Sequence, residues 1–232
     1  MTEYKCPSRA AERSGSVTPQ QSISSANARI DGRKNMTTFT EQPQVAESES
    51  NRVSGVFHGS AQTTVSTGAY RFLVDEPEAS GGKNAAPNPM EYILGATNGC
   101  ISVVIEAKSG THQIPIQGIH TYSYASQDLG GLVAGRDVQP HFHTYHLAVL
   151  VQTDVRDADR LRAFAQDVEH ACPAANLLRA AQGLQLTVHW QFVDRLVDHD
   201  AEAVVNQALG VPNRNEPVDA AEPFLTLTNP DA

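Results

Sequence analysis

The sequence predicts an α+β domain, and three observations lead to this fold class. Short runs of β-forming residues alternate with polar residues between Arg52 and Val74. A long helical segment begins only after a loop rich in glycine and proline, and further strand-like and helix-like segments follow it up to Val193. No internal repeat, heptad pattern or glycine-rich phosphate loop interrupts this order, which is typical of an α+β domain.

Three parts of the chain differ in composition. Residues 1–50 are rich in small polar residues and lack apolar periodicity, so we expect a flexible N-terminal extension. Residues 51–196 carry the α+β pattern and form the predicted domain. Residues 197–232 form a C-terminal extension in which only one short helix, near 201–209, is expected.

Each element of the domain has its own sequence signal. The runs at 53–57, 63–65 and 69–74 predict an antiparallel meander, because Gly59 and Gly68 separate them. From Met90 to about Ala107 apolar residues fall on nearly every face, which predicts a central helix enclosed on all sides. The remaining segments are strands at about 118–126, 142–153 and 184–193, and helices at about 157–170 and 173–181.

Charge and hydropathy narrow the classes of partner. The net charge of −9 would repel a phosphate backbone or an anionic bilayer, so we expect neither nucleic acid nor membrane as a partner. No apolar run approaches the ~18 residues of a membrane span, and residues 1–30 lack the apolar core of a signal peptide. We therefore expect a cytoplasmic protein that binds small molecules or other proteins.

The chain has three cysteines, and the expected cytoplasmic location is reducing, so structural disulfides between them are not expected. Cys6 lies in a polar stretch without an obvious partner. Cys172 precedes Pro173, a residue favoured in the first turn of a helix, so its sulfur is expected near N–H groups that stabilise a thiolate. A small packing residue at a helix turn is an equally good interpretation of Cys172. Cys100 lies among apolar helical residues, where burial alone would raise its pKa and make it inert.

Several segments, in order, resemble the OsmC-like family. They are Asp75-Glu76-Pro77, Gly81-Gly82, Pro87 through Leu94, Asn98-Gly99-Cys100, Asp128 through Leu132, the long strand near 140–151, and Cys172-Pro173 after a helix. The resemblance covers roughly residues 52–195. It implies antiparallel sheets wrapped around a central cysteine-bearing helix, in an intertwined homodimer with its active sites at the interface.

The resemblance also implies thiol peroxidase activity against organic hydroperoxides, in oxidative-stress defence and without a metal or cofactor. Cys100 would be the peroxidatic cysteine and become a sulfenic acid. Cys172 would be the resolving cysteine, and a lipoylated or other dithiol protein would reduce the resulting disulfide. The apolar surroundings of Cys100 favour a hydrophobic peroxide.

Glu91 occupies the family's glutamate position. It precedes Cys100 by nine residues, which on a helix places the two side chains on opposite faces and ~13.5 Å apart along the axis. One helix cannot direct both groups at one substrate, so a catalytic Glu91 would come from the partner subunit. The alternative is that Glu91 only favours the N-terminus of its helix.

One family feature is not matched. Peroxidase members carry an arginine on the N-terminal strands, and the corresponding positions here are His58, Gly59 or Ser60, with Arg52 and Arg71 as the nearest substitutes. Without that cation Cys100 has little reason to ionise. A non-catalytic dimer that binds a small hydrophobic ligand therefore stays open as the alternative function.

A third function, metal-dependent hydrolysis, would need the histidine cluster. His141 and His143 would share one face of a strand and His146 would point to the other. Two ligands do not make a metal site, so an ordinary polar strand face is the preferred interpretation.

Overall fold

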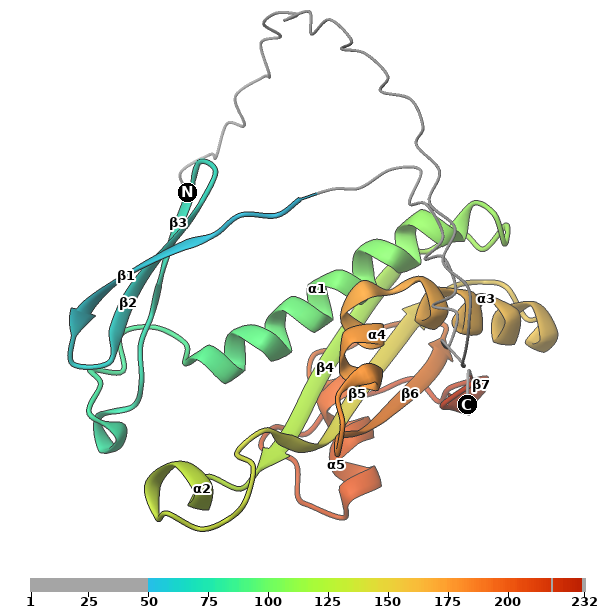
Figure 1. Cartoon of the computed structure of the whole chain (residues 1–232). Coiled ribbons are helices and arrows are strands. Elements are labelled where there is room, and N and C mark those ends of the chain that lie inside the picture. The colour runs from blue at the N-terminus through green and yellow to red at the C-terminus, as the bar shows by residue number, and fades with distance from the viewer. Residues whose placement is uncertain (1–49, 218, 231–232) are drawn as a thin grey trace, which may run out of the picture. The chain divides into compact units, whose positions relative to one another are not determined.

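A computed structural model describes residues 50–217 and 219–230 of the 232-residue chain (Figure 1). Cys6 and the N-terminal extension expected for residues 1–50 lie outside these ranges, apart from residue 50. The described part contains two sheets, a long helix and several shorter ones, so it is an α+β structure. None of its helices is long and apolar enough to cross a lipid bilayer.

The first sheet is the expected antiparallel meander. Its strand order is β1-β2-β3, and the register pairs Val56 with Thr64 and Val65 with Phe72. The bounds of its strands are β1 Ser54–Gly59, β2 Gln62–Thr67 and β3 Tyr70–Val74.

Asp75 organises the loop between β3 and the long helix. Its buried carboxylate accepts hydrogen bonds from the Gln62 side chain and from the backbone N–H groups of Glu76, Lys83 and Ala85. Burial would raise the pKa of Asp75, but these hydrogen bonds outweigh it and lower the pKa to about 2. The carboxylate thus stays ionised and fixes the loop, which contains the 3₁₀ helix η1 Glu78–Ser80.

The long helix α1 (Pro89–Ser109) contains the expected helix and extends it by one or two residues at each end. Only Thr97, Ile101 and Ile105 are buried along it, whereas Ile93 and Val103 are 43% and 66% exposed. The prediction of a helix enclosed on all sides is therefore wrong for the isolated chain. The reason is that α1 packs with one face against β4, α3 and α4, where Leu94 and Val104 are partly buried, and leaves Ile93 and Val103 exposed.

The second sheet has the order β4-β5-β6-β7. Its strands are β4 Gly118–Gln127, β5 Phe142–Gln152, β6 Gln185–Val193 and β7 Leu225–Thr228. The expectation of antiparallel sheets is wrong at one pair, because β5 and β6 are parallel. Two helices, α3 Ala158–Ala171 and α4 Pro173–Ala180, connect β5 to β6. Such a helical crossover lets β6 run in the same direction as β5.

The two faces of this sheet carry separate cores. Leu147 and Val149 on β5 belong to the larger core, which includes Ile101 of α1 and Phe164 of α3. The alternate residues Ala148 and Leu150 pack on the other face against α5 (Asp200–Leu209). A four-residue helix, α2 (Gly130–Val133), lies in the connection between β4 and β5.

The C-terminal segment docks on the chain's own sheet, which the sequence did not predict. Strand β7 pairs antiparallel with β6, and Asn229 Oδ1 accepts a hydrogen bond of 2.7 Å from the Val188 N–H. The Arg156 guanidinium lies 3.8 Å above the centre of the Phe224 ring. The edge of β6 is thereby covered.

Candidate functional site

The N-terminus of α1 is a capping box, and Glu91 is part of it. The Asn88 side chain accepts hydrogen bonds of 2.9 Å from the N–H groups of Met90 and Glu91, while Glu91 Oε2 accepts one of 2.8 Å from the Asn88 N–H. Pro89 occupies the first helical position. In the isolated chain Glu91 therefore has the helix-capping role that the sequence offered as the alternative.

The chain brings Cys100 and Cys172 together although 72 residues separate them. Cys172 Sγ lies 3.7 Å from Cys100 Sγ, in contact but not bonded. Cys100 comes from the middle of α1, where the buried Ile101 and Ile105 fix the helix against the sheet. Cys172 comes from the junction of α3 and α4. Closure to a disulfide needs the sulfurs to approach by less than about 2 Å.

Cys172 ends one helix and begins the next. Its N–H donates to the Val168 carbonyl at the end of α3, and the residue is also the N-cap of α4, followed by Pro173. The sequence placed it correctly at this N-cap and left a stabilised thiolate and a packing residue as equally good interpretations. Burial raises the pKa of the Cys172 thiol, and the Ala175 and Ala174 amides oppose this effect without cancelling it. Cys172 is fully buried in the larger core, which favours the packing interpretation for the isolated chain.

The two thiols differ in access to solvent. Cys100 is partly exposed, whereas Cys172 has no exposed surface. A reagent from solvent thus meets Cys100 first, and the proximity of Cys172 lets it act in a second step. This asymmetry was not visible in the sequence, which suggested that Cys100 would be the more buried of the two.

The positions that replace the family's arginine carry other groups. His58 hydrogen-bonds through Nε2 to Thr64 Oγ1 at 2.8 Å, and Gly59 and Ser60 form a turn with positive φ. Arg52 and Arg71 lie exposed at the three-stranded sheet. Neither arginine contacts a cysteine among the interactions of the described residues.

A polar chain that the sequence did not reveal joins α1 to the sheet beside Cys100. The Tyr145 hydroxyl donates to Ser123 Oγ at 2.9 Å, and Ser123 Oγ donates to Asn98 Oδ1 at 2.5 Å. Asn98 precedes Cys100 by two residues, and Tyr145 is fully buried. The Asn98-Gly99-Cys100 segment was the only signal, because the partners on β4 and β5 are distant along the chain.

The histidines form two pairs. The rings of His141 and His143 have centres 4.7 Å apart, while His146 stacks on His189 of β6 with its Nδ1 3.2 Å from the His189 Nε2. In the part of the chain that the structure describes, no three His, Cys, Asp or Glu side chains are grouped to hold a metal. The geometry thus gives no support to metal-dependent hydrolysis.

The His146–His189 pair predicts acid sensitivity. Burial lowers the pKa of both imidazoles, and the charge of His146 lowers the pKa of His189 further. A lowered pKa means that the unfolded chain takes up protons that the folded chain does not, so stability is full above the ordinary histidine pKa of about 6.5 and falls below it. Urea denaturation at pH 7.5 and pH 5.5 should show this loss. The loss of stability between pH 7.5 and pH 5.5 should be smaller in a double variant with His146→Gln and His189→Gln. An equal loss in that variant would contradict the assignment of the acid sensitivity to this pair.

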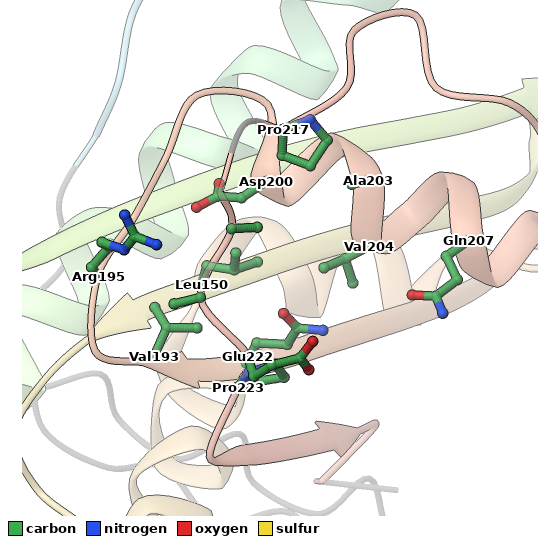
Figure 2. Close-up of a pocket in the computed structure, with 13 residues that line it drawn as sticks. Leu150, Val193, Arg195, Asp200, Ala203, Val204, Gln207, Pro217, Glu222 and Pro223 are labelled. Carbon is green, nitrogen blue, oxygen red and sulfur yellow. The ribbon is translucent and has the colours of Figure 1, made fainter.

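The cavity in Figure 2 is separate from the thiols. It has a volume of about 180 Å³ and lies between α5, the sheet and the C-terminal segment, with Leu150, Val193 and Pro223 among its lining residues. Leu150 faces α5, on the side of the sheet opposite to the core that contains Cys172. No cysteine lines this cavity, so it is not part of the thiol site.

Comparison with known proteins agrees with this architecture. The family model described as OsmC-like protein matches residues 81–187. An OsmC-like protein from Mycoplasma pneumoniae has a similar structure, with a TM-score of 0.55 and 14% identity over 63% of this chain and 99% of that one. An OsmC-like protein of unknown function from Vibrio cholerae gives a TM-score of 0.50 and 10% identity, over 63% of this chain and 100% of that one.

A structure described as an organic hydroperoxide resistance protein OsmC, from Legionella pneumophila, gives a TM-score of 0.45 and 17% identity over 60% of this chain and 96% of that one. None of the curated proteins matches the chain. The likeness to the Mycoplasma and Vibrio structures, at 14% and 10% identity, shows a shared fold alone.

Proposed function

We propose that this chain, whose residues 81–187 match the family model described as OsmC-like protein, is a thiol peroxidase that reduces organic hydroperoxides through Cys100 and Cys172. The distance of 3.7 Å between the two sulfurs carries this proposal. Two cysteines whose sulfurs meet in the fold are well placed for reversible thiol chemistry.

The reaction has three balanced steps. The Cys100 thiolate attacks the distal oxygen of the peroxide ROOH, the O–O bond breaks, and ROH leaves with a proton while Cys100 becomes a sulfenic acid. Cys172 then attacks the Cys100 sulfur, which forms the disulfide and releases water. A dithiol protein, for instance a lipoylated one, reduces this disulfide by exchange and becomes oxidised itself.

Access and burial support these roles. Cys100 is the thiol that solvent reaches, so it is the peroxidatic residue, and the buried Cys172 is the resolving residue. The raised pKa of Cys172 keeps it protonated until the sulfenic acid forms beside it. A reducing compartment such as the cytoplasm would keep both thiols available.

Uncovered apolar side chains support a homodimer. Val103 on α1 is 66% exposed, and Phe57 and Tyr70 on the first sheet are 68% and 76% exposed. Burial of these exposed apolar groups against a second copy of the chain would remove them from water. The partner's copy of Glu91 could then reach the thiol site. A monomer at micromolar concentration in sedimentation experiments would contradict this arrangement.

The alternative function, a non-catalytic dimer that binds a small hydrophobic ligand, rests on two observations. The family's arginine is absent at 58–60, and the pKa of Cys172 is raised instead of lowered. Both features reduce thiolate content at neutral pH.

Addition of cumene hydroperoxide to the reduced protein separates the two functions. In a Cys6→Ser background we expect the loss of both remaining thiols per chain and a Cys100–Cys172 disulfide in peptide mapping. A protein that keeps both thiols under excess peroxide would end the peroxidase proposal and leave the ligand-binding alternative.

A further inference from the structure

The junction between α3 and α4, which carries Cys172, is tied by side chains whose roles the reaction above does not use. Glu169 lies three residues before Cys172, in the last turn of α3, and its side chain is fully buried. Arg179 lies in the last turn of α4, and Trp190 lies on β6. The three side chains meet on the inner side of the junction.

Glu169 is bonded to both neighbouring elements. Its Oε1 accepts a hydrogen bond of 2.7 Å from Trp190 Nε1, and its Oε2 pairs with Arg179 Nη2. Arg179 Nη1 also donates to the Glu169 carbonyl at 3.1 Å. The side chain and the backbone of one residue in α3 are thus held by one residue of α4, while the sheet holds the carboxylate from the other side.

Asn176 makes a second tie on the outer side of the same junction. Its Nδ2 donates to the His170 carbonyl at 2.6 Å and to the Cys172 carbonyl at 3.0 Å. The His170 carbonyl lies in the last turn of α3, where the helix itself supplies no donor, and the Cys172 carbonyl also accepts the first helical hydrogen bond of α4 from the Asn176 N–H. The backbone on both sides of Cys172 is therefore fixed to α4.

A buried carboxylate is costly, and stability alone is a poor reason for it, because apolar residues of the same volume often stabilise a core as well. What a buried ion pair supplies is directional geometry. Here the ion pair of Glu169 lies about one helical turn before Cys172. The Cys172 sulfur must approach the Cys100 sulfur by less than about 2 Å to form a disulfide bond.

We propose that Glu169, Arg179, Trp190 and Asn176 form a positioning clamp that holds Cys172 against Cys100 and so raises the effective concentration of one thiol for the other. This inference rests on the proposed redox role of the pair. The clamp residues act through the position of the Cys172 backbone. Loss of the clamp lets the start of α4 sample more conformations, and the disulfide becomes easier to reduce.

The equilibrium with glutathione measures this effect without any peroxide. The protein dithiol reduces one molecule of oxidised glutathione and becomes the disulfide, and two molecules of reduced glutathione are released. Two electrons and two protons pass from the protein to glutathione. In a Cys6→Ser background the equilibrium constant reports only the Cys100–Cys172 pair. We expect Glu169→Gln and Arg179→Met each to lower it about tenfold, which corresponds to about 30 mV. Arg179→Lys, which keeps the charge, should restore part of the loss.

Two controls distinguish positioning from general stability. Val205→Ala removes buried volume on the opposite face of the sheet, so it should lower stability and leave the glutathione equilibrium unchanged. Asn176→Ala truncates a largely exposed side chain, so it should fold and still shift the equilibrium in the same direction as Glu169→Gln.

The outcomes separate this inference from the proposed function. A wild type that forms no intramolecular disulfide at any glutathione ratio contradicts the redox role itself. The clamp is overturned if the wild type forms the disulfide and the Arg179→Met and Asn176→Ala variants fold and have the same equilibrium constant as the wild type. Urea denaturation followed by circular dichroism reports whether each variant is folded.

Discussion

Replacement of Cys100 by serine should abolish the reaction with organic hydroperoxides, whereas replacement of Cys172 should stop it after the first step. The Cys100→Ser variant lacks the thiol that solvent reaches, so its second-order rate constant with cumene hydroperoxide should fall by on the order of 10³ or more. The Cys172→Ser variant keeps the attacking sulfur but has no second thiol within 3.7 Å, so it should accumulate a sulfenic acid. Stopped-flow kinetics and dimedone labelling with mass spectrometry measure both results.

The serine variants are well matched controls for each other. Each exchanges one sulfur of the contacting pair for oxygen, and both should be made in a Cys6→Ser background so that the unrelated thiol does not react. If Cys100→Ser kept its reactivity and Cys172→Ser lost it, the two roles would be exchanged. Such a result would mean that a fully buried thiol is exposed by motion of α4.

The order of elements could be predicted because its signals are local. Pro89 and Pro173 mark helix starts, and periodic apolar residues placed α3 correctly, with Leu161 and Phe164 on its buried face. The parallel pairing of β5 with β6 and the docking of β7 depend on segments far apart in the chain. Leu225–Thr228 is too short to give a strand signal without knowledge of the edge that it covers.

The candidate site shows the same division between local and distant information. The N-cap position of Cys172 follows from Pro173, and the capping role of Glu91 follows from Asn88 three residues earlier. The direction of the Cys172 pKa shift could not be predicted, because it depends on burial by residues of several other elements. The ion pair of Glu169 with Arg179 was missed because both residues resemble ordinary charges on amphipathic helices.

Substitution of Gly82 by alanine should be among the most destabilising single changes in the loop that leads into α1. A Cβ atom at this position would lie 1.9 Å from the Glu76 carbonyl oxygen and 2.8 Å from Asp75 Oδ1. The first atom is backbone, and the second belongs to the carboxylate that organises the loop, so neither can move without loss of hydrogen bonds. We expect a loss of about 2–4 kcal/mol in the free energy of unfolding, measured by urea denaturation.

Gly110→Ala provides the matched control for Gly82→Ala. Gly110 ends α1 with φ −64° and ψ −42°, and a Cβ atom there would meet no atom within 4 Å. Alanine at this position should therefore be neutral or stabilise the fold by up to about 1 kcal/mol, because it restricts the unfolded chain. Equal stability of the two variants would show that the loop yields to a side chain at Gly82. In that case the Asp75 carboxylate would not fix this segment, and its hydrogen bonds could not account for the position of the α1 N-terminus.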